Sequence, residues 1–358
     1  MVRGTHNLKR YVQAALLPRM INGRDAPPMP PEGHRSHRNN LAVRPETWRR
    51  LENIYSLDNF DFENVVSSCK CQFSRIDMFF PFEPLRMDDM DEDNGDTLSI
   101  PCPGTNFDIT YREERKPSNL QRIAPWVDNL ALMTVQRIMH LLYPGSHPFT
   151  FTLADDRDDD RPIFQHYLWS IPEHILEGLP EENRRQVQFS SVIVAFQPPW
   201  VLSTQDIKEF SKCRSFPPFI EPGHAVSFSF FKIPESFAKY ELICSFRHRS
   251  ILWDLCVRKN TPWFVLTSYN HWTFGMFSKG WTSAFVSGVY EYNHHHPTIT
   301  ECLTYWIASA MRLATTLRCP KVCEEPSNSE TPCTVYDVMA EWPEAALALA
   351  LLDQNSPD

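Results

Sequence analysis

The chain has 358 residues, of which 42% are apolar and 13% aromatic, and this composition excludes an intrinsically disordered protein. Only 11 Gly accompany 30 Pro, which argues against sites built from glycine-rich phosphate loops. The net charge of -9 argues against nucleic-acid binding by the surface as a whole. No apolar run approaches the roughly 20 residues that span a bilayer, so we expect no membrane insertion.

Residues 1–44 are predicted to form a basic, Pro-rich, flexible arm, of which residues 1–40 are expected to be poorly ordered and dispensable for folding. Residues 1–50 contain ten Lys and Arg but only three acids, Asp25, Glu32 and Glu46. Such a segment is typical of a solvated tail. An Arg-rich start also occurs in mitochondrial transit peptides, but those favour serine, which is scarce here. Any contact with nucleic acid is expected to run through this arm.

Residues 45–150 are predicted to be a helical and strand region that packs on the main core. We expect a helix over Pro45–Leu57, a strand over Gln72–Phe80 and an amphipathic helix over Trp126–Tyr143. The sequence Pro144-Gly145 ends that last helix. His140 lies on its apolar face, where a histidine is more often a satisfied core residue than a catalyst.

Residues 151–318 are predicted to form the main domain. Strands are expected at Ile163–Trp169, Val192–Phe196, Trp263–Ser268, Trp272–Phe277 and Ala284–Val289. The second of these is apolar at every position, which is typical of a strand covered on both faces. The third and fourth form a hairpin across Asn270-His271. Because Gly275 interrupts an aromatic strand, we expect either a β-bulge or a close backbone approach at that position.

Helices alternate with these strands. Ser203 is expected to cap a short helix, with Asp206 as the acid of a capping box. Longer helices are expected over Ser236–Arg258 and Thr298–Leu317, and residues 319–358 are predicted to be a loop followed by the helix Val335–Leu352. The order of elements predicts an α/β or α+β fold with a mixed central sheet flanked by helices.

The ten cysteines favour a reducing compartment. Most lie in apolar stretches, as free buried thiols do, and the apolar run near the start is too short for a signal peptide. We therefore expect an intracellular protein, cytoplasmic or nuclear. Weak zinc candidates are Cys319, Cys323 and Cys333, with Cys302 and His294–His296 nearby in the sequence. A second close pair of cysteines does not follow, so we expect unrelated cysteines, no structural metal and no cofactor.

One stretch of the chain resembles other proteins. The block Trp263–Trp281, preceded by Gln197-Pro-Pro-Trp200 and by Arg214-Ser-Phe-Pro-Pro-Phe219, resembles uncharacterised proteins of mushroom-forming, basidiomycete fungi. The similarity covers about residues 160–315 and implies no activity.

The late strands of this block also resemble those of PD-(D/E)xK nuclease-like domains, which would make the sheet restriction-endonuclease-like. In that superfamily a strand carrying Asp precedes a strand carrying Glu-x-Lys, and together they hold Mg²⁺. Carried onto Ile163–Trp169, the Asp position is His166. Carried onto Ile193–Gln197, the Glu position is Ala195 and the Lys position is Gln197. The resemblance therefore implies a copy that has lost its catalytic residues, since a hard cation does not bind Ala and Gln.

Two functions of different classes remain open at this point. The first is a non-catalytic binding or interaction module with a degenerate nuclease-like core, acting on a protein partner. The alternative is an active metal-dependent hydrolase or nuclease whose carboxylates come from Asp108, Glu113, Glu114, Asp155–Asp160 and Glu173. Convergent carboxylates in a cleft would favour the enzyme, and a filled apolar centre would favour the module.

Overall fold

The computed structural model describes residues 8–38, 51, 53–57, 96–100, 116–154, 165–211, 251–313 and 317. The predicted strand Gln72–Phe80, the predicted helix Val335–Leu352 and the first part of the predicted helix Ser236–Arg258 lie outside these residues.

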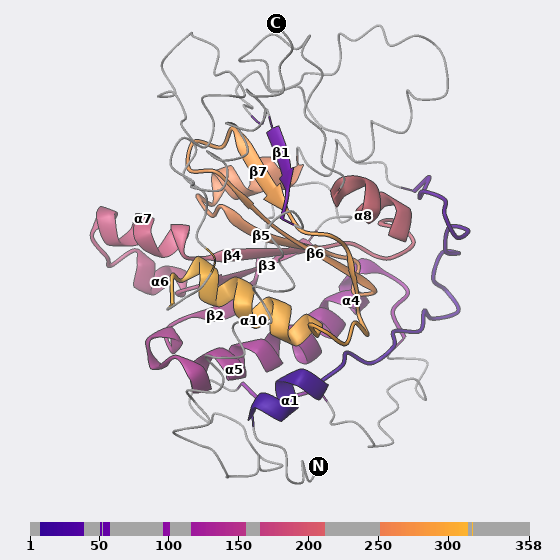
Figure 1. The fold of residues 1–358 in the computed structure, drawn as a ribbon, viewed down its shortest axis with the longest axis horizontal. Coiled ribbons are helices and arrows are strands. Elements are labelled where there is room, and N and C mark those ends of the chain that lie inside the picture. The colour runs from indigo at the N-terminus through magenta and orange to yellow at the C-terminus, as the bar shows by residue number, and fades with distance from the viewer. Residues whose placement is uncertain are drawn as a thin grey trace, which may run out of the picture.

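A mixed sheet of eight strands forms the centre of the molecule (Figure 1). The spatial order is β1-β7-β6-β5-β4-β3-β2, and β8 pairs with β6 beside this path. The pairs β4/β5 and β1/β7 are parallel, and the other neighbours are antiparallel. The strands are β1 (Asn53–Ser56), β2 (Thr150–Leu153), β3 (Gln165–Ser170), β4 (Val192–Phe196), β5 (Trp263–Thr267), β6 (His271–Phe277), β7 (Ser283–Val286) and β8 (Tyr290–Glu291). The prediction of a mixed sheet with flanking helices is confirmed.

Helices cover both faces of this sheet. One face packs on α1, α4, η4, α5 and α10, and the other packs on α8 and the helical residues 251–258. These helices are α1 (Leu8–Ala14), α4 (Leu120–Trp126), the π-helix η4 (Val127–Leu132), α5 (Met133–Leu142), α8 (Thr204–Ser211) and α10 (Ile299–Ala310). The remaining elements η5 (Pro144–Ser146), α6 (Glu173–Leu176) and α7 (Glu181–Phe189) lie in the connections between strands.

Strand β4 contributes side chains to two separate hydrophobic cores, one on each face of the sheet. All five of its residues are buried, and they alternate between clusters: Val192 and Val194 pack in one, Ile193 and Ala195 in the other. This alternation is what the period of two along a strand imposes, and it confirms the prediction of a strand covered on both faces.

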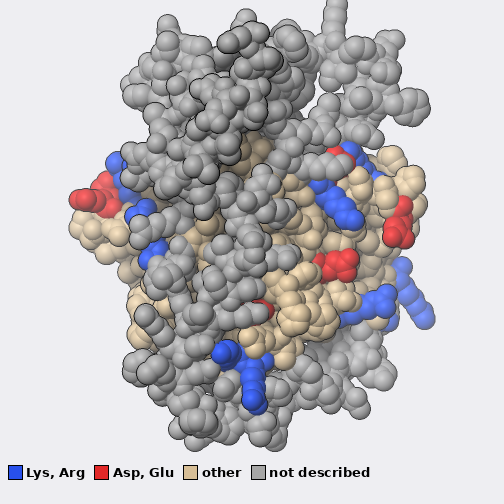
Figure 2. Space-filling view, in the orientation of Figure 1, with Lys and Arg blue, Asp and Glu red and all other residues tan. Residues whose placement is uncertain are grey.

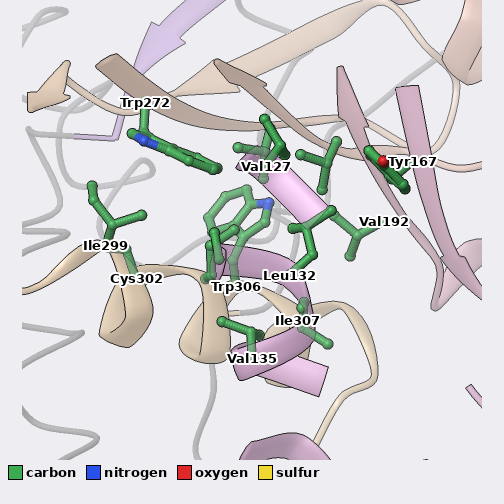
Figure 3. Packing of buried hydrophobic residues seen from close by; sticks show 14 of the residues in the cluster. Val127, Leu132, Val135, Tyr167, Val192, Trp272, Ile299, Cys302, Trp306 and Ile307 are labelled. Carbon is green, nitrogen blue, oxygen red and sulfur yellow. The ribbon is translucent and has the colours of Figure 1, made fainter. Parts of the chain in front are cut away.

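Helix α10 is the buried helix of the larger core. It begins with the reciprocal capping box of Thr298 and Glu301, and all of its twelve residues are buried. Trp306 lies in the middle of this core, between Trp272 and residues of η4 (Figure 3). Its indole nitrogen donates to the Phe264 carbonyl at 3.1 Å, so even the polar atom of this side chain is paired. The predicted helix Thr298–Leu317 ends earlier, at Ala310.

The first strand of the sheet lies where a helix was predicted. Residues 53–56 were expected to continue the helix Pro45–Leu57, but they form β1 and pair in parallel with β7. In the strand, Ile54 and the half-buried Tyr55 contact opposite cores. Pairing with a strand some 230 residues further along the chain, as the register gives it, therefore overrides the local helical pattern.

Residues 8–38 pack on the domain, in contrast to the flexible arm expected over residues 1–44. Tyr11, Val12, Ala15 and Leu17 are buried in the larger core. The hydroxyls of Thr298 and Thr300 donate to the carbonyls of this segment at residues 12 and 15. The segment then passes from α1 along the molecule to α8 (Figure 1). Its apolar residues and its hydrogen-bonded backbone offset the entropy lost on ordering, which the basic composition alone did not reveal.

The sheet also crosses the expected domain boundaries. The boundary between residues 150 and 151 falls inside β2, and β1, from the region 45–150, belongs to the same sheet as the strands of 151–318. Residues 319–358 lie outside the described part. Within the residues that the structure describes, we find no helix that is long and apolar enough to cross a membrane.

Candidate functional site

The positions suggested by the nuclease resemblance lie together at two interior strands of the sheet, and we call this group of positions the β3–β4 centre. Strands β3 and β4 are antiparallel neighbours, and His166 pairs directly with Ala195. Gln197 follows the end of β4, where its main-chain N–H donates to the Thr267 carbonyl at 3.1 Å. All three residues are buried, with exposed fractions of 3% for His166 and 0% for the other two.

Apolar side chains fill the space beside Ala195. It belongs to the smaller core, which also contains Leu202, just before α8, and Ile207 in that helix. Phe264 and Leu266 on β5 belong to the same core. A carboxylate at this position would be desolvated by these neighbours. Imidazole, methyl and amide groups are not the oxygen-rich anionic ligand set that Mg²⁺ requires, so the residues present do not fit that metal.

Among the other candidate groups, those that the structure describes lie away from this pair of strands. Asp108, Glu113, Glu114, Asp155–Asp160, Cys319, Cys323 and Cys333 lie outside the described residues. Glu173 is exposed at the first position of α6. Cys302 is buried in α10, and His294 has its Nδ1 atom 2.7 Å from the Pro297 carbonyl. Across the described ranges, no three His, Cys, Asp or Glu side chains are grouped so that they could hold a metal ion.

A buried polar cluster lies next to this centre, at the carboxyl ends of the parallel strands β4 and β5. These ends meet because Phe196 pairs with Thr267, and such ends are where open α/β sheets commonly bind ligands. Thr267 Oγ1 accepts from the Tyr269 N–H at 2.8 Å and donates to the His271 carbonyl at 2.8 Å. The hairpin therefore turns at residues 268–270, with Tyr269 at φ 67°, and His271 belongs to β6 rather than to the expected turn.

Helix α8 begins beside this cluster with the predicted capping box. The Asp206 N–H donates to Ser203 Oγ at 3.2 Å, and Asp206 Oδ2 accepts from the Ser203 N–H at 2.9 Å. The same carboxylate oxygen accepts from the Ser36 N–H at 3.0 Å, across 170 residues of sequence. The capping box is confirmed, and the additional contact with the N-terminal segment is one that local sequence patterns do not reveal.

His271 is the titratable group at this edge. Its Nε2 atom lies 3.3 Å from Thr204 Oγ1, at the first position of α8. Burial lowers the pKa of His271; the charge of Lys208 also lowers this pKa, and the charge of Glu291 opposes both effects. The imidazole is therefore kept neutral near pH 7, and it ties the start of β6 to α8.

The core also contains a buried His–Asp contact that sequence reasoning missed. His140 Nδ1 lies 2.5 Å from Asp96 Oδ2, its Nε2 lies 2.9 Å from the Phe149 carbonyl, and the His140 and Asp96 side chains are both fully buried. Both ring nitrogens are thus occupied, so the imidazole cannot accept a proton from a substrate. The expectation that His140 is a satisfied core residue is confirmed. Its acid partner lies 44 residues earlier, beyond the reach of a helical pattern.

A second unforeseen feature is the π-helix η4. Burial raises the pKa of Asp128, in this helix, to about 6. Burial and the negative charge of Asp128 also raise the pKa of Tyr167, whose hydroxyl donates to the Ala124 carbonyl at 3.2 Å. π-Helical turns often mark functional positions. Here, however, the tyrosine hydroxyl is committed to the backbone, so the pair offers a carboxyl group and no free nucleophile.

The described charges on one face of the molecule are of mixed sign. On the face shown in Figure 2, the described Lys and Arg residues are interspersed with Asp and Glu. Comparisons of the chain with protein-family models, curated proteins and solved structures find no match.

Proposed function

We propose that this protein is a non-catalytic binding or interaction module built on a degenerate nuclease-like core. The observation that carries the proposal is the cross-strand pair of His166 and Ala195, buried where the resemblance would require two metal-binding carboxylates. Adjacent strands are the arrangement that the resemblance requires. Ala195 belongs to the smaller apolar core, which is not a setting for the metal-binding carboxylates of a hydrolytic site.

The proposal favours binding over catalysis because the polar groups next to this centre are engaged with one another. Asp206 caps α8, Thr267 holds the hairpin, and His271 contacts Thr204. A binding module needs such fixed polar groups at an edge, whereas an enzyme also needs a reactive group within reach of substrate.

The experiment uses the full chain with plasmid and single-stranded DNA in the presence of Mg²⁺ or Mn²⁺. We expect no cleavage above that of a metal-free control. A cleavage activity that copurifies with the protein would overturn the proposal. In that case, the variant His166→Ala tests whether the β3–β4 pair is responsible for the activity. If His166→Ala abolishes cleavage, the β3–β4 pair carries it; if cleavage persists, carboxylates elsewhere in the chain carry it.

A further inference from the structure

The segment of residues 34–36 lies against the N-terminal end of α8 as a bound peptide would. The Ser36 N–H donates to Asp206 Oδ2 at 3.0 Å, and Ser36 Oγ donates to the Trp200 carbonyl at 2.6 Å. Ser203 Oγ donates to the His34 carbonyl at 3.1 Å. Hydrogen bonds to a main-chain N–H and a main-chain carbonyl are the usual way in which a protein holds an extended peptide.

An ion pair adds side-chain recognition to these backbone contacts. Arg35 Nη2 lies 3.3 Å from Glu209 Oε2, and the exposed fractions of the two side chains are 15% and 7%. The Gln205 amide donates to the other carboxylate oxygen of Glu209 at 3.1 Å, which fixes the acid on α8. Helix α8 and the residues before it thus present the two buried carboxylates of Asp206 and Glu209 and the Trp200 carbonyl, and the segment supplies a cation, a hydroxyl and an N–H.

This contact is separable from the rest of the N-terminal segment. Residues 8–20 are anchored by apolar burial, with Tyr11, Val12, Ala15, Leu17 and Met20 at 5% exposure or less. Between residues 21 and 38, only Ser36 is buried, and Met29 is 44% exposed. Residues 31–38 are held by hydrogen bonds and an ion pair, whereas Gly23 and Ala26 nearer the start of the segment also contact the domain. Such polar contacts contribute less to stability than a packed core, so residues 31–38 should open without unfolding the domain.

We infer that the N-terminal end of α8 is a recognition site for an extended Arg–Ser peptide, which Arg35 and Ser36 of the same chain occupy reversibly. The inference rests on the proposed binding role and gives it a site and a ligand class. The occupant is the chain's own segment because residues 8–20 tether it on the same domain, which gives it a high local concentration. A partner with a similar donor-rich, basic segment would compete with it for Asp206 and Glu209.

Hydrogen exchange tests whether the contact opens by itself. In the native protein, residues 31–38 should exchange at least tenfold faster than residues 8–20. The double variant Arg35→Ala, Ser36→Ala should raise the rate for 31–38 by a further tenfold or more and leave 8–20 unchanged. Arg38→Ala, which changes an exposed neighbouring cation, is the matched control and should alter neither rate. Exchange of both segments at one common rate in every protein would overturn the inference.

Peptide binding tests the site itself. A fluorescent peptide with the sequence of residues 30–40 should bind the double variant at least tenfold more tightly than it binds the native protein. A control peptide with Ala at the two positions should bind the double variant at least tenfold more weakly than the parent peptide. Equal binding of the two peptides would overturn the inference. The native protein could instead form a concentration-dependent dimer that the double variant does not form. That result would show that the segment of a second copy occupies the site, and it would contradict the inference that the segment of the same chain does.

These results are independent of the cleavage assay. If the peptide does not bind and the protein does not cleave DNA, the peptide site is refuted and the proposed non-catalytic role stands. DNA cleavage removes the proposed role whatever the peptide does.

Discussion

Gly275 sits where a side chain cannot be added without moving an aromatic ring. It pairs in regular register with Phe264 on β5 and Val286 on β7, so the β-bulge expected as one alternative is wrong; the group that approaches Gly275 closely is the side-chain ring of Phe264 rather than the backbone expected as the other. A Cβ atom at Gly275 would lie 2.2 Å from Phe264 Cζ and 2.5 Å from Cε2. Carbon atoms at contact are about 3.5–4.0 Å apart, so the ring would have to move by more than about 1 Å.

The ring has little room for such a move. Phe264 is 1% exposed, and its ring centroid lies 5.0 Å from that of Phe277 and 6.2 Å from that of Phe210. Overpacking a closed core costs about 1–3 kcal/mol, whereas replacing glycine in a strand by alanine gains only about 0.5–1 kcal/mol. We therefore expect Gly275→Ala to lower the free energy of unfolding by about 1–3 kcal/mol.

Denaturant unfolding measures this cost, and a second variant assigns it to the ring. In the background Phe264→Leu, which removes the clashing atoms, Gly275→Ala should be neutral or slightly stabilising. The coupling between the two positions should exceed about 1 kcal/mol. Gly145→Ala is the control, because a Cβ there meets nothing within 4 Å. An equal cost of Gly275→Ala in both backgrounds, or no cost at all, would refute the reasoning.

Three further predictions concern ionisable groups. The pKa of Asp128 is raised from 3.8 to about 6, so its charged form opposes folding above pH 6, and this penalty disappears as the pH falls from 6 to 3.8. Asp128→Asn should stabilise by about 1–2 kcal/mol at pH 8 and by almost nothing at pH 3.5, as denaturant midpoints at the two pH values would reveal. Burial raises the pKa of Tyr269, so the free energy of unfolding should fall as the pH rises above about 10, where the phenol ionises in the unfolded chain. In Tyr269→Phe, the denaturant midpoint of unfolding should depend less on pH in this range. His140→Leu should cost about 1–3 kcal/mol by removing the nearer of two partners of the buried Asp96 side chain, because Arg137 Nη1 still lies 3.9 Å from Asp96 Oδ1; the same unfolding assay measures the loss.

The parts of the fold that were predictable from sequence are those whose signal is local. The continuous apolar run of β4, the aromatic pattern of β5 and β6, and the capping box of α8 each depend on neighbouring residues. β1 was mistaken for a helix because its strand conformation depends on distant pairing with β7. The N-terminal segment was missed because its basic composition obscured a short apolar pattern of Tyr11, Val12 and Ala15 that packs on the core.

The candidate site was predictable to the same extent. The sequence pointed to two neighbouring strands, and β3 and β4 are neighbours with His166 opposite Ala195. The polar contacts elsewhere in the core could not be predicted, because the contacting residues are far apart in the sequence: 170 residues separate Ser36 from Asp206, and 44 separate Asp96 from His140. A polar contact of this kind leaves no periodic pattern in a sequence, so only the folded chain reveals it.

The central claim is that the β3–β4 pair no longer holds a metal, and the thermal midpoint of unfolding with and without Mn²⁺ tests it most directly. The native protein should show the same midpoint in both conditions. The triple variant His166→Asp, Ala195→Glu, Gln197→Lys buries charged groups, so its metal-free midpoint should fall, and Mn²⁺ should restore part of the loss by binding only the folded state. A midpoint of the native protein that rises with Mn²⁺ would contradict the loss of the site. A triple variant that folds normally and ignores Mn²⁺ would contradict the nuclease-like placement of these strands.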